Sequence, residues 1–112
     1  MARGALVVLV TAPREKAKDI ARHLIKNRLA ACVNVISEVE SIYWWQGKIE
    51  DDREALLIIK TRIDVLPRLM REVKRVHPYQ VPEIIALPIV AGLEEYLEWL
   101  ESEVKNGGSS EP

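Results

Sequence analysis

The chain alternates between two spacings of apolar residues, one typical of strands and the other typical of helices. Four mostly apolar runs are long enough for buried strands and too short for helices: residues 5–10, 31–36, 55–60 and 84–90. Three other segments repeat apolar residues every three or four positions, as amphipathic helices do: residues 17–25, 66–76 and 93–104. The pattern therefore predicts the order strand, helix, strand, strand, helix, strand, helix.

Turn-forming residues predict where some of these elements begin and end. Thr11-Ala12-Pro13 predicts the start of the first helix, with Thr11 or Ala12 near the cap and Pro13 inside the first turn. Asp64 is placed to cap the second helix. Pro78 stops that helix, because proline cannot continue it.

The second strand is predicted to be long and to belong to a hairpin. Its alternation resumes over residues 39–45 after an interruption at Ser37-Glu38, which we interpret as a bulge. Two turns compete to follow it, one at Gln46-Gly47 and the other at Asp51-Asp52. The choice between them sets the length of the hairpin.

Two strand–helix–strand halves joined by a hairpin describe an α/β (α+β) fold, the ferredoxin-like sandwich. Right-handed crossovers would place the first two helices on the same face of one antiparallel sheet. We assign residues 1–105 to this single domain. Residues 106–112 are mostly small and polar, and we expect them to form a flexible C-terminal tail.

The strands carry apolar residues on both faces, although a sheet covered on one face needs them only there. Residues 7–10, 56–59 and 84–87 are apolar at successive positions, and the last helix is too small to cover a whole face. We therefore predict a homo-oligomer that buries the second face between copies of the chain. The alternative is a monomer whose last helix covers that face entirely. The aromatic hairpin tip, Tyr43-Trp44-Trp45, also favours association.

Composition and charge narrow the classes of function. The chain has 112 residues, 16 basic and 17 acidic side chains and a formal charge of −1, which argues against a general nucleic-acid binder. No apolar run reaches membrane-spanning length, so we expect no membrane insertion. The first residues lack a signal-peptide layout, and we expect a cytoplasmic protein. Cys32 is the single cysteine, which excludes an intrachain disulfide.

Five blocks of residues, in order along the chain, are similar to those of one known family. They are Ala30-Ala31-Cys32-Val33-Asn34, Ser41-Ile42-Tyr43-Trp44-Trp45-Gln46-Gly47-Lys48, Glu54 with Lys60-Thr61, His77-Pro78-Tyr79-Gln80-Val81-Pro82-Glu83-Ile84-Ile85, and Tyr96-Leu97-Glu98-Trp99-Leu100. Together they resemble the CutA divalent-cation tolerance family. The resemblance implies a cytoplasmic homotrimer of ferredoxin-like protomers that contributes to tolerance of divalent metal ions such as copper. It implies no enzymatic reaction, and a divalent metal ion is the one candidate cofactor.

Candidate metal ligands are few. A soft metal such as copper favours thiolate and imidazole ligands, but the one cysteine and two histidines have no chelating spacing. We name His77, Glu83 and Cys32 as candidate ligands of a site assembled in three dimensions. Some members of the family have a cysteine and a second histidine where this chain has Val10 and Val76.

Each candidate ligand also has a structural interpretation. His77 suits the C-terminal end of a helix, where the helix dipole favours it. Cys32 suits a small core position in a strand, and Glu83 suits an ion pair with Lys60 or with an arginine of another subunit. His23 falls on the polar side of the first helix, and we interpret it as a surface residue.

A second candidate site is a cleft between subunits. Tyr43, Trp44 and Lys60 are candidates to line it together with Tyr79 and Glu83, and Trp45 is a further interface candidate. Plain interface packing is the alternative for the same residues.

Two other functions remain open from the sequence. One is a small-ligand-binding signalling trimer like the P-II regulators, although the chain lacks their glycine-rich and basic phosphate contacts. The other is a structural or anchoring trimer for a protein partner. No phosphate loop, nucleophile elbow or paired-carboxylate motif indicates an enzyme.

Overall fold

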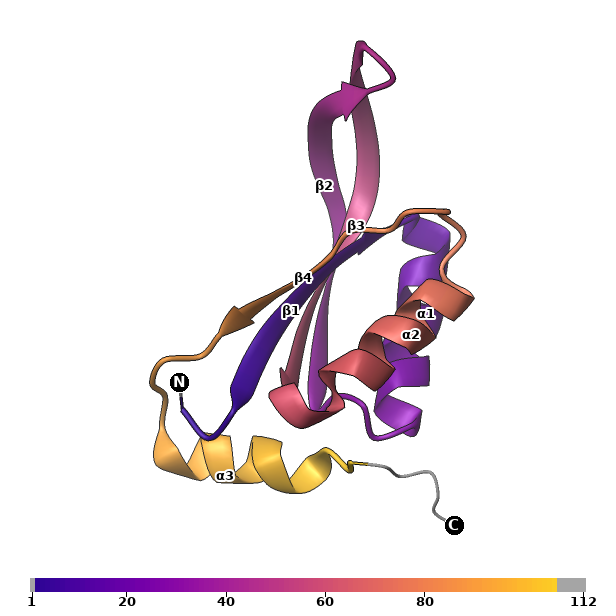
Figure 1. Ribbon diagram of the computed structural model, residues 1–112. Coiled ribbons are helices and arrows are strands. Elements are labelled where there is room, and N and C mark those ends of the chain that lie inside the picture. The colour runs from indigo at the N-terminus through magenta and orange to yellow at the C-terminus, as the bar shows by residue number, and fades with distance from the viewer. Residues whose placement is uncertain (1, 107–112) are drawn as a thin grey trace.

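The computed structural model describes residues 2–106 as a four-stranded sheet with three α-helices (Figure 1). The strands are β1 (Ala5–Ala12), β2 (Cys32–Trp45), β3 (Lys48–Arg62) and β4 (Ile84–Pro88). The helices are α1 (Arg14–Lys26), α2 (Leu66–Val76) and α3 (Glu94–Glu103), with a 3-10 turn, η1 (Ile63–Val65), before α2. The predicted order of elements is confirmed. The predicted tail, apart from its first residue, lies outside the described residues.

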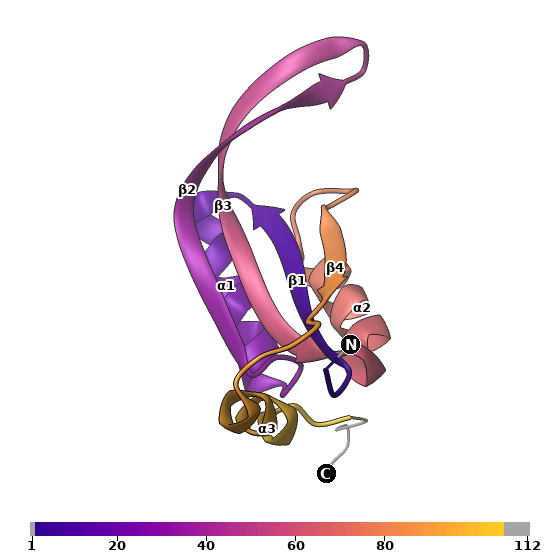
Figure 2. The ribbon, with the colours of Figure 1, turned by 90° about the vertical axis from the view of Figure 1, so that its left-hand side faces the viewer.

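The sheet has the strand order β2-β3-β1-β4, and every neighbouring pair is antiparallel. Each half of the chain contributes two strands that enclose one strand of the other half. Helices α1 and α2 lie on the same face of the sheet (Figures 1 and 2). This is the ferredoxin-like sandwich that the sequence predicts.

The main core lies between the sheet and the two helices on that face. Helix α1 buries one face, made of Ala17, Ile20, Ala21 and Leu24. Helix α2 buries Leu69 and Val73, whereas Met70, an apolar residue of the segment predicted to form this helix, is exposed. Alternate residues of β1 and β3 meet the helices from the sheet, among them Val8, Val10, Leu57 and Ile59. Burying each such side chain contributes about 1.5–3 kcal/mol.

The β2–β3 hairpin extends well beyond the rest of the sheet and curls over at its tip (Figure 2). Gln46 and Gly47 form its two-residue turn with φ angles of 51° and 79°, the positive values that a tight hairpin turn requires. The competing turn at Asp51-Asp52 is wrong, because both residues pair with β2. The pairing shifts register between Ile36 and Val39, which confirms the predicted bulge.

Several predicted boundaries differ from the structure. Strand β1 continues through Ala12 in its pairing with β3, so Pro13 is the residue before α1, and α1 begins at Arg14. Asp64 lies in η1 and does not cap α2, because its carboxylate instead pairs with the Arg62 guanidinium at 2.7 Å. Strand β4 ends at Pro88, before the predicted end at residue 90.

The face of the sheet opposite α1 and α2 is largely open (Figure 2). Helix α3 lies across one end of the sheet and leaves the rest of that face uncovered (Figure 1). Ile85 and Leu87 of β4 point outward there, with 51% and 46% of their surfaces exposed. The alternative in which the last helix covers this face entirely is therefore wrong. No helix within residues 2–106 has both the length and the apolar content needed to cross a membrane.

Candidate ligand cavity at the base of the hairpin

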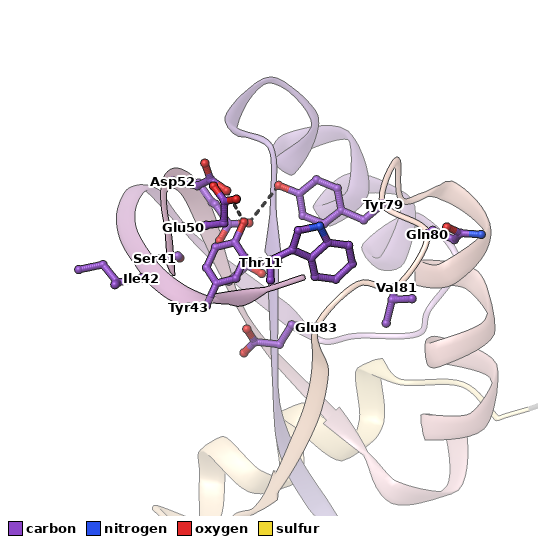
Figure 3. A pocket seen from close by; sticks show the side chains of 12 residues that line it. Thr11, Ser41, Ile42, Tyr43, Glu50, Asp52, Tyr79, Gln80, Val81 and Glu83 are labelled. Atoms are coloured by element: carbon purple, nitrogen blue, oxygen red, sulfur yellow. Dashed lines mark hydrogen bonds between the residues drawn. The ribbon is translucent and has the colours of Figure 1, made fainter. Parts of the chain in front are cut away.

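A cavity of about 840 Å³ opens where the hairpin leaves the sheet and meets the segment between α2 and β4 (Figure 3). Its lining residues come from β1, from both hairpin strands and from the α2–β4 segment: Thr11, Ser41, Ile42, Tyr43, Trp45, Glu50, Asp52, Glu54, Tyr79, Gln80, Val81 and Glu83. Pockets for small molecules typically measure about 300–1,000 Å³. The cavity thus has room for an organic molecule and is far larger than a bare ion.

Strand alternation brings the carboxylates of β3 to this cavity. Glu50, Asp52 and Glu54 are alternate residues of β3, and Glu50 and Asp52 pair with Tyr43 and Ser41 of β2. Side chains two positions apart in a strand lie on the same face, so these polar groups all line the inner side of the hairpin. Together with Glu83 they give the cavity four carboxylates.

Glu54 is the most deeply enclosed of these carboxylates, with 7% of the residue exposed. Its Oε1 accepts a hydrogen bond from the Tyr79 hydroxyl at 3.0 Å. Within residues 2–106, its Oε2 has no donor, and no lysine or arginine forms an ion pair with it. Arg14 and Arg53 border an adjoining hollow, but they pair with Glu38 at 3.3 and 3.6 Å.

Two tyrosine hydroxyls hold carboxylates in place, and Figure 3 shows both hydrogen bonds as dashed lines. The Tyr43 hydroxyl donates to Asp52 Oδ2, which raises the pKa of Tyr43 to about 12. Burial and the hydrogen bond to Glu54 raise the pKa of Tyr79 to about 12. Both hydroxyls therefore stay protonated at neutral pH and remain donors.

His77 ends α2 and forms the corner beside the cavity. It is buried, with 7% exposed, and its ring lies 4.7 Å from the Tyr79 ring, centroid to centroid. Its Nε2 lies 2.7 Å from the Thr11 carbonyl oxygen and its Nδ1 lies 3.1 Å from the Tyr79 amide nitrogen. The network assigns a neutral ring in which Nε2–H donates to Thr11 and Nδ1 accepts from Tyr79. A metal ion would have to displace one of these bonds.

The other predicted ligands are not all brought together with His77. Glu83 is exposed and lines the cavity, whereas Cys32 lies at the far end of β2, paired with Lys60. Lys60 in turn pairs with Val7, four residues along β1 from Thr11, which places Cys32 roughly 13 Å or more from the His77 corner. A single chain therefore does not unite Cys32 with His77 and Glu83.

The predicted cleft residues are also divided. Tyr43, Trp45, Tyr79 and Glu83 line the cavity. Trp44 is not among the lining residues and is 72% exposed, and the Lys60 ammonium instead donates to the Asn34 side chain on the open sheet face. Glu50, Asp52 and Glu54 were not among the site residues predicted from the sequence. The three residues alternate along the chain, which would indicate that they share one face of a strand. A possible turn at Asp51-Asp52 obscured this, because a turn there would interrupt the strand.

The donor set argues against a tight metal site within one chain. Among the residues that the structure describes, no group of three or more His, Cys, Asp or Glu side chains is arranged to hold a metal ion. Both nitrogens of His77 already have partners.

Comparison with known proteins identifies the family. The model of the CutA1 divalent ion tolerance protein family matches residues 6–103. The divalent-cation tolerance protein CutA of Thermus thermophilus is 53% identical over 95 residues, covering 84% of this chain and 92% of that protein. The crystal structure of CutA1 from Oryza sativa superposes with a TM-score of 0.88 at 50% identity, covering 90% of this chain and 94% of that one.

Some relatives are considerably longer. Protein CutA, chloroplastic, of Arabidopsis thaliana is 48% identical over 103 residues, and the match covers 91% of this chain but 57% of the plant protein. The similarity nevertheless spans nearly all of the sheet, the hairpin and the three helices described above. The chain therefore belongs to the CutA1 divalent ion tolerance protein family.

Proposed function

We propose that this protein is a cytoplasmic, single-domain homotrimer that supports tolerance of divalent metal ions such as copper by binding them weakly, without catalysing a reaction. Family membership supports the link to divalent cations. The observation that carries the binding part is the cavity beside His77, which gathers four carboxylates and no lysine or arginine from residues 2–106. Such a cavity concentrates cations electrostatically even without a rigid coordination shell.

The open face of the sheet supports the trimer. Apolar side chains of β4 that are about half exposed in one chain gain burial when another copy covers them. The acidic cavity also disfavours the P-II-like alternative. Nucleotide phosphates need helix N-termini or basic groups, and the four carboxylates would repel them.

Equilibrium dialysis against copper tests the metal-binding proposal. We expect weak binding to the native protein, and His77→Ala should weaken it about tenfold if the imidazole is a ligand. His23→Ala is the matched control, because His23 contacts Glu72 between α1 and α2 and lies away from the cavity. Absence of copper binding to the native protein would overturn the proposal, and equal binding by His77→Ala would remove His77 from it.

A further inference from the structure

Glu54 presents an electrostatic problem that a lone chain leaves unsolved. A carboxylate that is more than nine-tenths buried normally has a cationic partner, since desolvation of an unpaired charge is costly. Here the one hydrogen bond comes from a neutral phenol, Oε2 has no donor from residues 2–106, and Glu54 lines the cavity. The arginines of the adjoining hollow are held by Glu38. Glu54 therefore lacks a cationic partner within residues 2–106, and the cavity is where an outside partner would reach it.

The walls of the cavity indicate what kind of cation fits. Tyr43, Trp45 and Tyr79 contribute aromatic rings, and Ile42 and Val81 contribute apolar surface. Aromatic faces attract ammonium groups and also pack against methylene chains, whereas a hydrated metal ion gains little from contact with them. The volume of about 840 Å³ and the absence of a three-ligand cluster within residues 2–106 also favour an organic cation over a metal ion.

The carboxylates are distributed over two walls. Glu50, Asp52 and Glu54 come from the hairpin strand β3, and Glu83 comes from the segment that leads into β4. Figure 3 labels Glu50, Asp52 and Glu83. A ligand with a single ammonium group would satisfy one wall only. A flexible chain with an ammonium group at each end can reach both, with its methylenes against the aromatic rings.

We propose that this cavity binds a linear organic polycation of the alkyl diamine or polyamine class, with one ammonium group paired to Glu54 and another to Glu83. This goes beyond metal-ion tolerance, because the ligand is recognised by its methylene chain as well as by its charge. It also leaves His77 with both of its backbone hydrogen bonds.

Isothermal titration calorimetry with putrescine and spermidine tests the proposal. We expect saturable binding of both amines to the native protein, tighter for spermidine, and none of 1,4-butanediol, which matches putrescine in length without its charges. Glu54→Gln should weaken binding about 10- to 100-fold, the usual effect of losing a charged hydrogen bond. The amide oxygen introduced by this change would still accept from Tyr79, so a melting curve should show an intact fold.

Two further variants keep the test decisive. Glu83→Gln alters an exposed cavity residue and should weaken spermidine more than a monoamine, even if Glu54→Gln proves unstable. Glu40→Gln removes a carboxylate from the same hairpin outside the cavity and should leave binding unchanged. Equal losses in all three variants would indicate unspecific attraction and overturn the proposal, as would displacement of spermidine by KCl and MgCl2 according to ionic strength alone.

An absence of heat with either amine would also overturn it. Metal binding is tested separately through His77→Ala, which changes no group assigned to the amine, so loss of copper binding with retained amine binding distinguishes the two proposals.

Discussion

At the scale of single residues, the cavity depends on one contact between distant parts of the chain. Tyr79 follows the corner after α2, and its hydroxyl reaches Glu54 in the middle of β3. The amide of Tyr79 also donates to His77 Nδ1, while His77 Nε2 donates to Thr11. The hairpin, β1 and the α2–β4 segment are thus joined through the side chains of two residues.

Tyr79→Phe should destabilise the fold because it leaves the buried Glu54 carboxylate without its donor. We expect a loss of about 1–3 kcal/mol in the free energy of unfolding, measured by urea denaturation at fixed protein concentration. Tyr43→Phe is the control, since its partner Asp52 is exposed and can turn to water. Equal losses for the two variants would show that the burial of Glu54 does not set the cost.

Single residues also show which parts of the cavity could be predicted from the sequence and which could not. The rigid segment around His77, Tyr79 and Glu83 could be identified from its prolines, and Tyr79 and Glu83 do line the cavity. Glu54 could not be identified, because its contact with the Tyr79 hydroxyl joins two distant parts of the chain. No local pattern records that contact between residues 25 positions apart.

At the scale of elements, the local patterns determined most of the fold. Apolar spacing located all seven main elements, and a single bulge and a two-residue turn accounted for the hairpin. The errors occurred where another contact competes with the role that the residue type suggests. Asp64 suits a helix cap by type but pairs with Arg62, and Asp51-Asp52 suits a turn but lies in a paired strand.

The contact between α1 and α2 gives a prediction about pH. Glu72 of α2 lies 2.8 Å from Arg75 and 2.7 Å from His23 of α1, and these hydrogen bonds lower the pKa of Glu72 from 4.5 to about 2. A carboxyl group whose pKa is lowered by folding stabilises the protein at pH values above the pKa that the group has in the unfolded chain. That contribution is complete above about pH 4.5 and disappears as the pH falls toward about 2.

Glu72→Gln should therefore cost stability near neutral pH and little in acid. Because the group lies near the surface, we expect a difference of about 1 kcal/mol that vanishes near pH 2. Urea denaturation of both proteins across this pH range measures the difference directly. Glu95→Gln, a change at an exposed position of α3, should show no such pH dependence, and a constant difference for Glu72→Gln would contradict the assignment.

At the scale of the whole molecule, one face of the sheet is covered by α1 and α2 and the other face is largely open. The sequence predicted this from strands that are apolar at successive positions, and the structure shows the second face open beyond the end that α3 occupies (Figure 2). The sequence could not specify how copies would pack, because it contains no record of relative orientation. The size of the assembly is therefore a matter for measurement.

Ile85→Asp should dissociate the proposed trimer, because it places a charge on the open sheet face where another copy would exclude water. Light scattering at micromolar concentration should give the native protein three times the chain mass of 12.8 kDa and give the variant a smaller mass. Ile25→Asp is the matched control, since Ile25 is also exposed but lies on α1, behind the sheet. A native mass near 12.8 kDa would mean that the apolar face remains in water and that the cavity must bind its ligands within a single chain.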